Sequence, residues 1–159
     1  MKPRLIPVQK SEQEEWIAFL LSREWPFDGE SQPEQDSLKK RFASLFTADT
    51  KCYWLVLKGS KVGLIKLSDL SNSPDEFPIL DLRIAKSSEG KGLATYALQE
   101  LVSLCFTQLG QRRLEGYTRE DNLGMQRVFE KCGFLKEAIF EKAGQGKMEN
   151  FSTPVVMQS

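Results

Sequence analysis

The chain has 159 residues and carries 22 basic and 22 acidic side chains, so its formal charge is zero. This length fits one domain of ordinary size, the balanced charge argues against a dedicated nucleic-acid-binding protein, and no apolar run approaches the roughly 20 residues of a membrane-spanning helix. Histidine is absent, which excludes Ser-His-Asp and Cys-His hydrolases and metal sites built on histidine.

The first part of the chain predicts one short strand and two amphipathic helices. Residues 5–8 form the strand. Ser11 and Glu14 have the spacing of a capping box, and apolar residues at helical spacing follow them. Ser31 and Glu34 have the same spacing ahead of a second amphipathic segment. We therefore expect two helices, separated by a turn that contains proline and glycine.

The middle of the chain predicts a hairpin followed by a β-α-β unit. Apolar residues 52–57 and 62–70 flank a short polar turn that contains a glycine. A strand at 79–85, a long amphipathic helix over 94–109 and a strand at 113–118 come next. Such a unit is expected to be parallel and right-handed.

The end of the chain completes a mixed architecture. Asn122 begins a short helix that Gly133 closes, and residues 134–140 and 148–157 are the last two strands. The element order is β-α-α-β-β-β-α-β-α-β-β. We predict an α+β (mixed α/β) fold with one domain over residues 1–159. Its central mixed sheet has about seven strands, is mostly antiparallel and carries helices on both faces.

The most informative motif is the glycine-containing loop that leads into the third helix. Gly90, Lys91 and Gly92 stand directly before that helix. Unpaired backbone N–H groups and the positive end of the helix dipole meet at such a start, which makes it a place for an anion, usually a phosphate. A plain tight turn is the structural alternative.

Two common phosphate-binding loops fit this motif poorly. The GxxxxGK spacing of a Walker loop is absent. A dinucleotide fingerprint would end on glycine or alanine, but the pattern that starts at Gly90 ends on Thr95. That fingerprint also normally follows the first strand of a parallel sheet, whereas here a hairpin comes before it. A nucleotide-binding oxidoreductase is therefore disfavoured.

The loop resembles the acyl-CoA loop of the GCN5-related N-acetyltransferases, the GNAT superfamily, which runs Arg/Gln-x-x-Gly-x-Gly/Ala. Gly92 and Ala94 stand at the two small positions. Residues 113–122 followed by 127–134 are similar to the fifth strand and fourth helix of the family, and the predicted element order matches throughout. The resemblance is closest to the ribosomal-protein and small-amine acetyltransferase branch.

The resemblance implies that the chain binds acetyl-CoA. The diphosphate of coenzyme A would lie on the backbone N–H groups of the loop, and the pantetheine arm would pair with the preceding strand. A backbone N–H on that strand would face the thioester oxygen. Asn122 would bond the pantetheine or its neighbourhood, serve as a simple N-cap, or do both. The implied coenzyme A-binding residues are Leu82, Arg83, Ile84, Glu89, Gly90, Lys91, Gly92, Leu93, Ala94, Thr95 and Asn122.

Three residues are candidates for the general base, namely Asp81, Glu115 and Tyr117. Glu115 and Tyr117 alternate on one face of a strand, and Asp81 lies one strand away. Two positions depart from the family pattern. Glu89 stands where the loop usually has arginine or glutamine, and Phe129 stands where many members have a tyrosine that protonates the departing thiolate. Water, another residue or a proton relayed from substrate must then protonate the thiolate.

These observations predict an N-acetyltransferase that moves an acetyl group from acetyl-CoA to a primary amine of a small molecule, a peptide or a protein N-terminus. The transfer would be direct, in a ternary complex and without a metal. The alternative is a non-catalytic acyl-CoA-binding or sensing domain. We expect a cytoplasmic monomer or homodimer without nucleic-acid or membrane partners, since the beginning of the sequence lacks a signal peptide and the three cysteines are widely spaced and read as reduced thiols.

Overall fold

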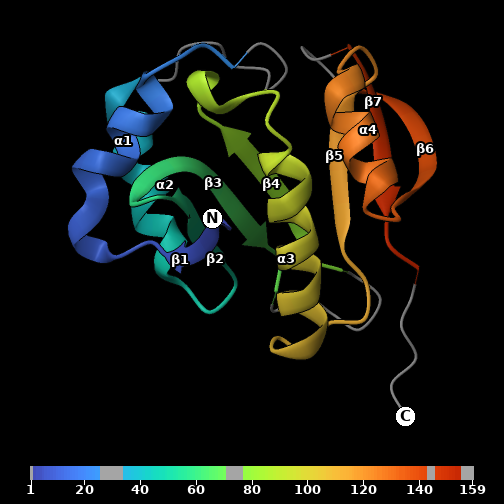
Figure 1. Ribbon diagram of the computed structural model, residues 1–159, viewed down its shortest axis with the longest axis horizontal. Helices are drawn as coiled ribbons and strands as arrows, with labels where there is room; N and C mark the ends of the chain where they lie inside the picture. The colour runs from blue at the N-terminus through green and yellow to red at the C-terminus, as the bar shows by residue number, and fades with distance from the viewer. Residues whose placement is uncertain (1, 26–33, 71–76, 143–145, 155–159) are drawn as a thin grey trace.

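The computed structural model describes residues 2–25, 34–70, 77–142 and 146–154. Seven strands form one sheet in the order β1-β2-β3-β4-β5-β7-β6 (Figure 1). Neighbouring strands are antiparallel except β4 and β5, which are parallel. The predicted fold class and element order are confirmed. The strands are β1 (Arg4–Pro7), β2 (Lys51–Leu57), β3 (Ser60–Ser68), β4 (Ile79–Ile84), β5 (Glu115–Arg119), β6 (Leu135–Lys142) and β7 (Gly146–Ser152).

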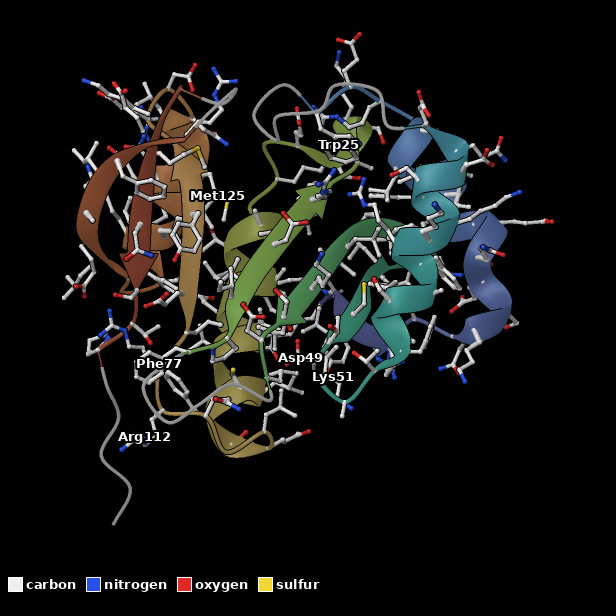
Figure 2. The ribbon with its side chains drawn as sticks, turned by 180° about the vertical axis from the view of Figure 1, so that it is seen from behind. Trp25, Asp49, Lys51, Phe77, Arg112 and Met125 are labelled. Atoms are coloured by element: carbon white, nitrogen blue, oxygen red, sulfur yellow. The ribbon has the colours of Figure 1, made fainter. Side chains whose placement is uncertain are left out.

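Helices cover both faces of the sheet, as predicted. Because side chains alternate along a strand, the buried residues separate into two clusters. Trp54 of β2 packs with α1 and α2, whereas its neighbour Leu55 packs with α3. Figure 2 shows α2 lying over the sheet on the first of these faces. The helices are α1 (Gln13–Leu21), α2 (Gln35–Ala43), α3 (Leu93–Thr107) and α4 (Leu123–Lys131), with short 3-10 turns η1 (Lys10–Glu12), η2 (Ser44–Phe46) and η3 (Lys86–Ser88). Within the described residues, no helix has the length and apolar character needed to cross a bilayer.

The predicted helix caps are corrected at the N-terminal side. The prediction that Ser11 and Glu14 form a capping box is wrong. The box is formed two residues earlier, where the Gln9 N–H donates to Glu12 Oε1 at 2.7 Å and η1 leads into α1. The second predicted box includes Ser31, which lies outside the described residues, and α2 follows Glu34 without a side-chain cap.

The last strand ends earlier than the hydrophobic pattern predicts. β7 pairs with β5 and β6 only as far as Ser152. The Thr153 N–H then donates to the Leu114 carbonyl, and the Thr153 hydroxyl oxygen accepts from the Leu114 N–H, both at 3.0 Å. Pro154 follows and has no N–H to continue a ladder. The predicted residues beyond it lie outside the described part of the chain.

The feature that positions the site is the short pairing between β4 and β5. The two strands are in register only where Ile79 faces Glu115 and Leu80 faces Gly116. Toward their C-terminal ends they no longer pair, although β4 continues to Ile84. The sheet therefore opens along the second half of β4, above the N-terminal end of α3 (Figure 1).

Candidate functional site

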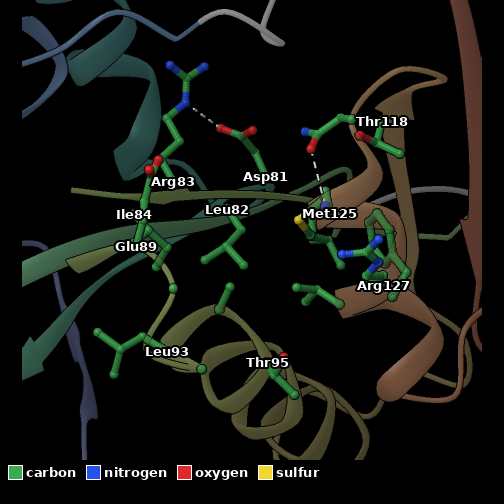
Figure 3. Close-up of a pocket in the computed structure, with 18 of the residues that line it drawn as sticks. Asp81, Leu82, Arg83, Ile84, Glu89, Leu93, Thr95, Thr118, Met125 and Arg127 are labelled. Carbon is green, nitrogen blue, oxygen red and sulfur yellow. Dashed lines mark hydrogen bonds and ion pairs between the residues drawn. The ribbon is translucent and has the colours of Figure 1, made fainter. Parts of the chain in front are cut away.

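A pocket of about 500 Å³ lies where β4 and β5 part (Figure 3). Its walls come from the open edge of β4, the first turn of α3, one face of α4 and Trp25 after the end of α1. Every predicted site residue lines this pocket except Lys91 and Glu115. Those that line it are Asp81, Leu82, Arg83, Ile84, Glu89, Gly90, Gly92, Leu93, Ala94, Thr95, Tyr117 and Asn122.

The floor of the pocket is the N-terminal end of α3, where backbone N–H groups point outward. Gly92 is the N-cap, with φ at 75°, and no side chain caps the helix. Tyr96 is the residue whose N–H returns to the Gly92 carbonyl, at 3.1 Å, so the N–H groups before it are the orphan donors of a helix start. A Cβ added at Gly90 or Gly92 would meet no atom within 4 Å. The donors therefore face open space, which fits a phosphate.

The side of the pocket formed by β4 presents unpaired backbone groups. The Glu115 N–H donates to the Pro78 carbonyl, and Arg23 Nη1 donates to the Ile84 carbonyl, each at 3.0 Å. Because the backbone groups of alternate residues face the same side of a strand, the N–H and C=O of Leu82 face this side too. There they offer a donor and an acceptor to an extended ligand.

Glu89 has a cationic partner that the sequence did not reveal. Its carboxylate forms an ion pair with Arg23, which follows α1. The Arg23 guanidinium also lies 4.8 Å from the centroid of the Trp25 ring, and its side chain is only 14% exposed. No local pattern around Arg23 marks this long-range contact. The expected repulsion between Glu89 and a diphosphate is therefore offset from within the protein.

Asp81 lies on the other side of β4 from α3. Figure 3 shows Asp81 and Arg83 pointing to this side, while Leu82 points toward α3. Arg83 Nε lies 3.1 Å from Asp81 Oδ2, and the Arg83 guanidinium lies 5.2 Å from the Trp25 ring centroid. The Asp81 carboxylate is held in place but is 40% exposed, so it can meet a ligand.

Tyr117 and Glu115 form a second polar group on β5. The Tyr117 hydroxyl donates to Glu115 Oε2 at 3.4 Å. Burial, and next the nearby Glu115 carboxylate, raise the pKa of Tyr117 above its ordinary value near 10. Glu115 itself lies outside the pocket lining, 3.7 Å from Arg113. Of the predicted base candidates, Asp81 and Tyr117 line the pocket, whereas Glu115 meets it through Tyr117.

The opposite wall belongs to α4. Asn122 Oδ1 accepts from the Met125 N–H at 3.2 Å, which confirms it as an N-cap, and the residue also lines the pocket. Phe129 is 1% exposed, and its ring stacks on Phe151 with the centroids 4.8 Å apart. Arg127 and Lys131, which the sequence did not single out, add positive charge to this wall.

A thiol ties this wall to α3. Cys132 Sγ donates to the Thr95 carbonyl at 3.6 Å, and burial raises the pKa of this thiol above its usual value near 9. Cys132 is therefore a neutral structural residue at neutral pH. Among the residues that the structure describes, no group of three His, Cys, Asp or Glu side chains is arranged to hold a metal ion.

Comparison with known sequences identifies relatives of this architecture. The family model of an acetyltransferase (GNAT) domain matches residues 4–135. The probable N-acetyltransferase YjcK of Bacillus subtilis is 32% identical over 81 residues, which are 51% of this chain and 45% of that protein. The uncharacterized N-acetyltransferase YjdG of the same organism is 27% identical over 84 residues, which are 52% of this chain and 50% of that protein. The match therefore spans about half the length of these curated relatives.

Solved structures share the whole fold. Spermidine N-acetyltransferase from Vibrio cholerae, in complex with coenzyme A and spermine, has a TM-score of 0.81 at 16% identity and covers 95% of this chain and 94% of its own. AAC(6')-Ib with ribostamycin and coenzyme A has a TM-score of 0.79 at 19% identity, with coverages of 96% and 93%. RimL, the ribosomal L7/L12 α-N-protein acetyltransferase, has a TM-score of 0.81 at 14% identity, with coverages of 98% and 95%. At such identities the likeness establishes the shared fold.

Proposed function

This chain belongs to the acetyltransferase (GNAT) family, and we propose on that premise that it transfers the acetyl group of acetyl-CoA to a primary amine. The acceptor would be a small molecule, a peptide or a protein N-terminus. The observation that carries the proposal is the uncapped N-terminal end of α3, with Gly90 and Gly92 before it, which opens into the pocket between β4 and β5. Three free cysteines agree with a reducing, cytoplasmic setting.

The pocket has the parts that coenzyme A needs. The orphan N–H groups at the start of α3 would hold the diphosphate, with Arg127 and Lys131 adding attraction from α4. Leu82 would pair its backbone with the pantetheine arm, as a neighbouring strand does. Asn122 keeps its carbonyl oxygen on the Met125 N–H, which leaves its amide nitrogen to donate to the ligand.

The chemistry assigned to each side chain follows from its surroundings. The thioester supplies the activated acetyl group. The Leu82 N–H would stabilise the negative charge that develops on the carbonyl oxygen, and such a fixed donor can contribute about 2.7–4 kcal/mol. Asp81 would accept the amine proton. Because its pKa is raised, Tyr117 keeps its proton at neutral pH, and we assign it as a donor for the leaving thiolate in place of Phe129.

Direct transfer is favoured over an acyl-cysteine route. The thiolate is the nucleophilic form of cysteine. Burial raises the pKa of Cys52 and of Cys105 to about 11, and it raises that of Cys132 as well. None of these thiols lines the large pocket. The amine would therefore attack the acetyl group itself, in a ternary complex.

We expect acetyl-CoA to stabilise the protein against heat and NAD to leave it unchanged. At a concentration 100 times its Kd, a ligand adds about 2.7 kcal/mol, which raises the Tm of a chain of this size by roughly 5–10 °C. Mass spectrometry of an amine mixture incubated with acetyl-CoA and the protein then separates enzyme from binding domain. A thermal shift without any acetylated amine would favour the non-catalytic alternative, which Phe129 keeps open. No shift at millimolar acetyl-CoA would contradict both.

The ion pair between Arg23 and Glu89 predicts a coupled effect on affinity for coenzyme A. Arg23→Gln leaves Glu89 uncompensated beside the phosphate site and should weaken binding by about tenfold, measured by calorimetry. Glu89→Gln removes the same repulsion and should tighten binding by about threefold. In the Glu89→Gln background, the loss caused by Arg23→Gln should shrink clearly.

The design separates charge neutralisation from a purely structural role. Arg23 also holds the Ile84 carbonyl at 3.0 Å. If that contact alone mattered, Arg23→Gln would weaken binding equally with Glu89 and with Gln at the loop position. Equal losses in the two backgrounds would therefore refute the compensation.

A further inference from the structure

A second, smaller cavity adjoins the large pocket on the face covered by α1 and α2. It has a volume of about 70 Å³ and shares Asp81 and Arg83 with the large pocket. Both side chains point to this face in Figure 3. The floor of the cavity is a row of cross-strand partners, in which Asp81 faces Lys66 and Lys66 faces Cys52. A molecule whose reacting group lies at Asp81 can thus place a neighbouring group in this cavity.

The small cavity carries more positive than negative charge. Arg41 of α2, Lys66 of β3 and Arg83 of β4 line it, and Asp81 is its one carboxylate. Burial raises the pKa of Cys52 to about 11, so this thiol adds no negative charge at neutral pH. The excess of cations contrasts with the zero formal charge of the whole chain. Such a cavity attracts an anionic group and repels a second ammonium group.

The roof of the cavity holds an unsatisfied hydrogen-bond donor. Trp16 is 5% exposed, and its indole Nε1 has no hydrogen-bond partner within the described part of the chain. The Cys52 sulfur beside it is only a weak acceptor. A buried donor without a partner is costly, and Trp16 lines the cavity. An oxygen atom bound there would satisfy it, which points to a ligand independently of the charges.

The size of the cavity limits the ligand group. A cavity needs roughly 10–15 Å³ to admit one water molecule. The volume of about 70 Å³ therefore admits a group of a few heavy atoms, such as a carboxylate. The side chains of Leu20, Leu45 and Leu64 complete the lining with apolar surface. In this partly apolar setting, the charges act more strongly than they would in water.

We propose that this cavity binds the carboxylate of the acceptor, so that the acceptor is an amino acid or another small amine with a carboxylate a few atoms from its nitrogen. The inference rests on the proposed acetyl transfer. The amine would lie at Asp81, between the two pockets. In the transfer the nitrogen bonds to the acetyl carbon and the carbon–sulfur bond breaks. One amine proton leaves to Asp81 and the sulfur takes a proton, giving an amide and free coenzyme A.

The proposal separates this chain from two of its structural neighbours. Spermine and ribostamycin, which those structures contain, are amines without a carboxylate. Here the cations Arg41, Lys66 and Arg83 would repel the additional ammonium groups of such acceptors. We therefore expect a selectivity opposite to that of a polyamine-binding site.

The test compares acceptors that differ in the carboxylate alone. Alanine and phenylalanine would each be supplied as the free acid, as the amide and as the decarboxylated amine, beside spermidine and phosphoethanolamine. Calorimetry on the protein saturated with coenzyme A gives affinities, and steady-state kinetics with acetyl-CoA give kcat and KM. We expect at least one free acid to bind tenfold or more tightly than its amide and its amine, and spermidine to bind more weakly still. Phosphoethanolamine should bind no better than the amines.

A variant pair localises the preference. Lys66→Met keeps the length of the side chain and removes its charge. It should raise the KM for the preferred acid tenfold or more, with kcat for the amide unchanged. Lys51→Met is the matched control, because Lys51 is an exposed lysine on β2 outside both pockets (Figure 2). It should leave both values unchanged.

Several outcomes would overturn the inference. They are equal affinity for acid and amide, tightest binding of spermidine or phosphoethanolamine, absence of binding by every free acid, and a preference that survives Lys66→Met. Binding of coenzyme A, titrated separately, tells this failure from failure of the proposed function. If coenzyme A binds and amines without a carboxylate are acetylated best, acetyl transfer stands and the acceptor assignment falls.

Discussion

Gly92→Glu should abolish the response of the protein to acetyl-CoA. Gly92 is the N-cap of α3 at φ 75°, and a Cβ there meets no protein atom within 4 Å. A glutamate would therefore project a negative charge into the space where the helix N–H groups receive an anion. We expect the Kd for coenzyme A to rise at least 100-fold, about 2.7 kcal/mol, in calorimetry. The left-handed backbone adds a strain of about 1–2 kcal/mol to the folded state.

Gly110→Glu is a matched control for that strain. Gly110 lies just beyond the other end of α3, has φ at 66°, and also has no atom within 4 Å of an added Cβ. It does not line the pocket. The two variants should lose similar stability on heating, whereas the Gly110 variant keeps the affinity of the wild-type protein for coenzyme A. Equal binding by both would remove the phosphate from the start of α3.

Gly116→Ala should cause the largest loss of stability among single methyl additions to this chain. A Cβ at Gly116 would lie 2.6 Å from Cε1 of Phe129, and still closer to Cζ. Phe129 has no room to withdraw, because it is 1% exposed and stacked on Phe151. Overpacking of this kind costs about 3 kcal/mol, which corresponds to a fall in Tm of roughly 6–12 °C. Urea unfolding gives the free energy of unfolding directly.

The clash can be tested by relieving it. In Gly116→Ala combined with Phe129→Leu, the alanine methyl takes part of the space that the ring leaves. The combined loss should therefore be smaller than the sum of the two single losses. Gly124→Ala is the control, because its nearest neighbour would be Asn122 Oδ1 at 3.9 Å and the position lies in α4. It should be neutral or stabilising by about 0.5–1 kcal/mol. Additive losses would mean that the ring does not cause the effect.

The sequence predicted those parts of the molecule that depend on local patterns. Hydrophobic periodicity gave the order of the elements, and the glycines before residue 93 marked the anion site, because both signals lie within a few consecutive residues. The residues predicted to hold coenzyme A gather at one pocket, apart from Lys91. Their roles in binding and catalysis stay predictions that the experiments above address.

Other features depend on contacts between distant segments and could not be predicted. Nothing near Arg23 announces that it reaches Glu89, because the partner stands 66 residues away. The orphan indole N–H of Trp16 becomes visible only when α1 covers β2 and β3. The end of β7 was missed because apolar residues continue past Ser152, while Thr153 turns its backbone toward Leu114.

The parting of β4 from β5 also bears on how the protein avoids unwanted association. Unpaired strand edges usually lie at the rim of a sheet, where they can recruit strands from other molecules and start aggregation. Here the exposed edge of Leu82 lies inside the sheet, between α3 below and α4 beside it. A strand of another protein would carry side chains too bulky for that enclosed space, whereas a thin, flexible chain without side chains can enter. The fold thus keeps a hydrogen-bonding edge open while shielding it from other polypeptides.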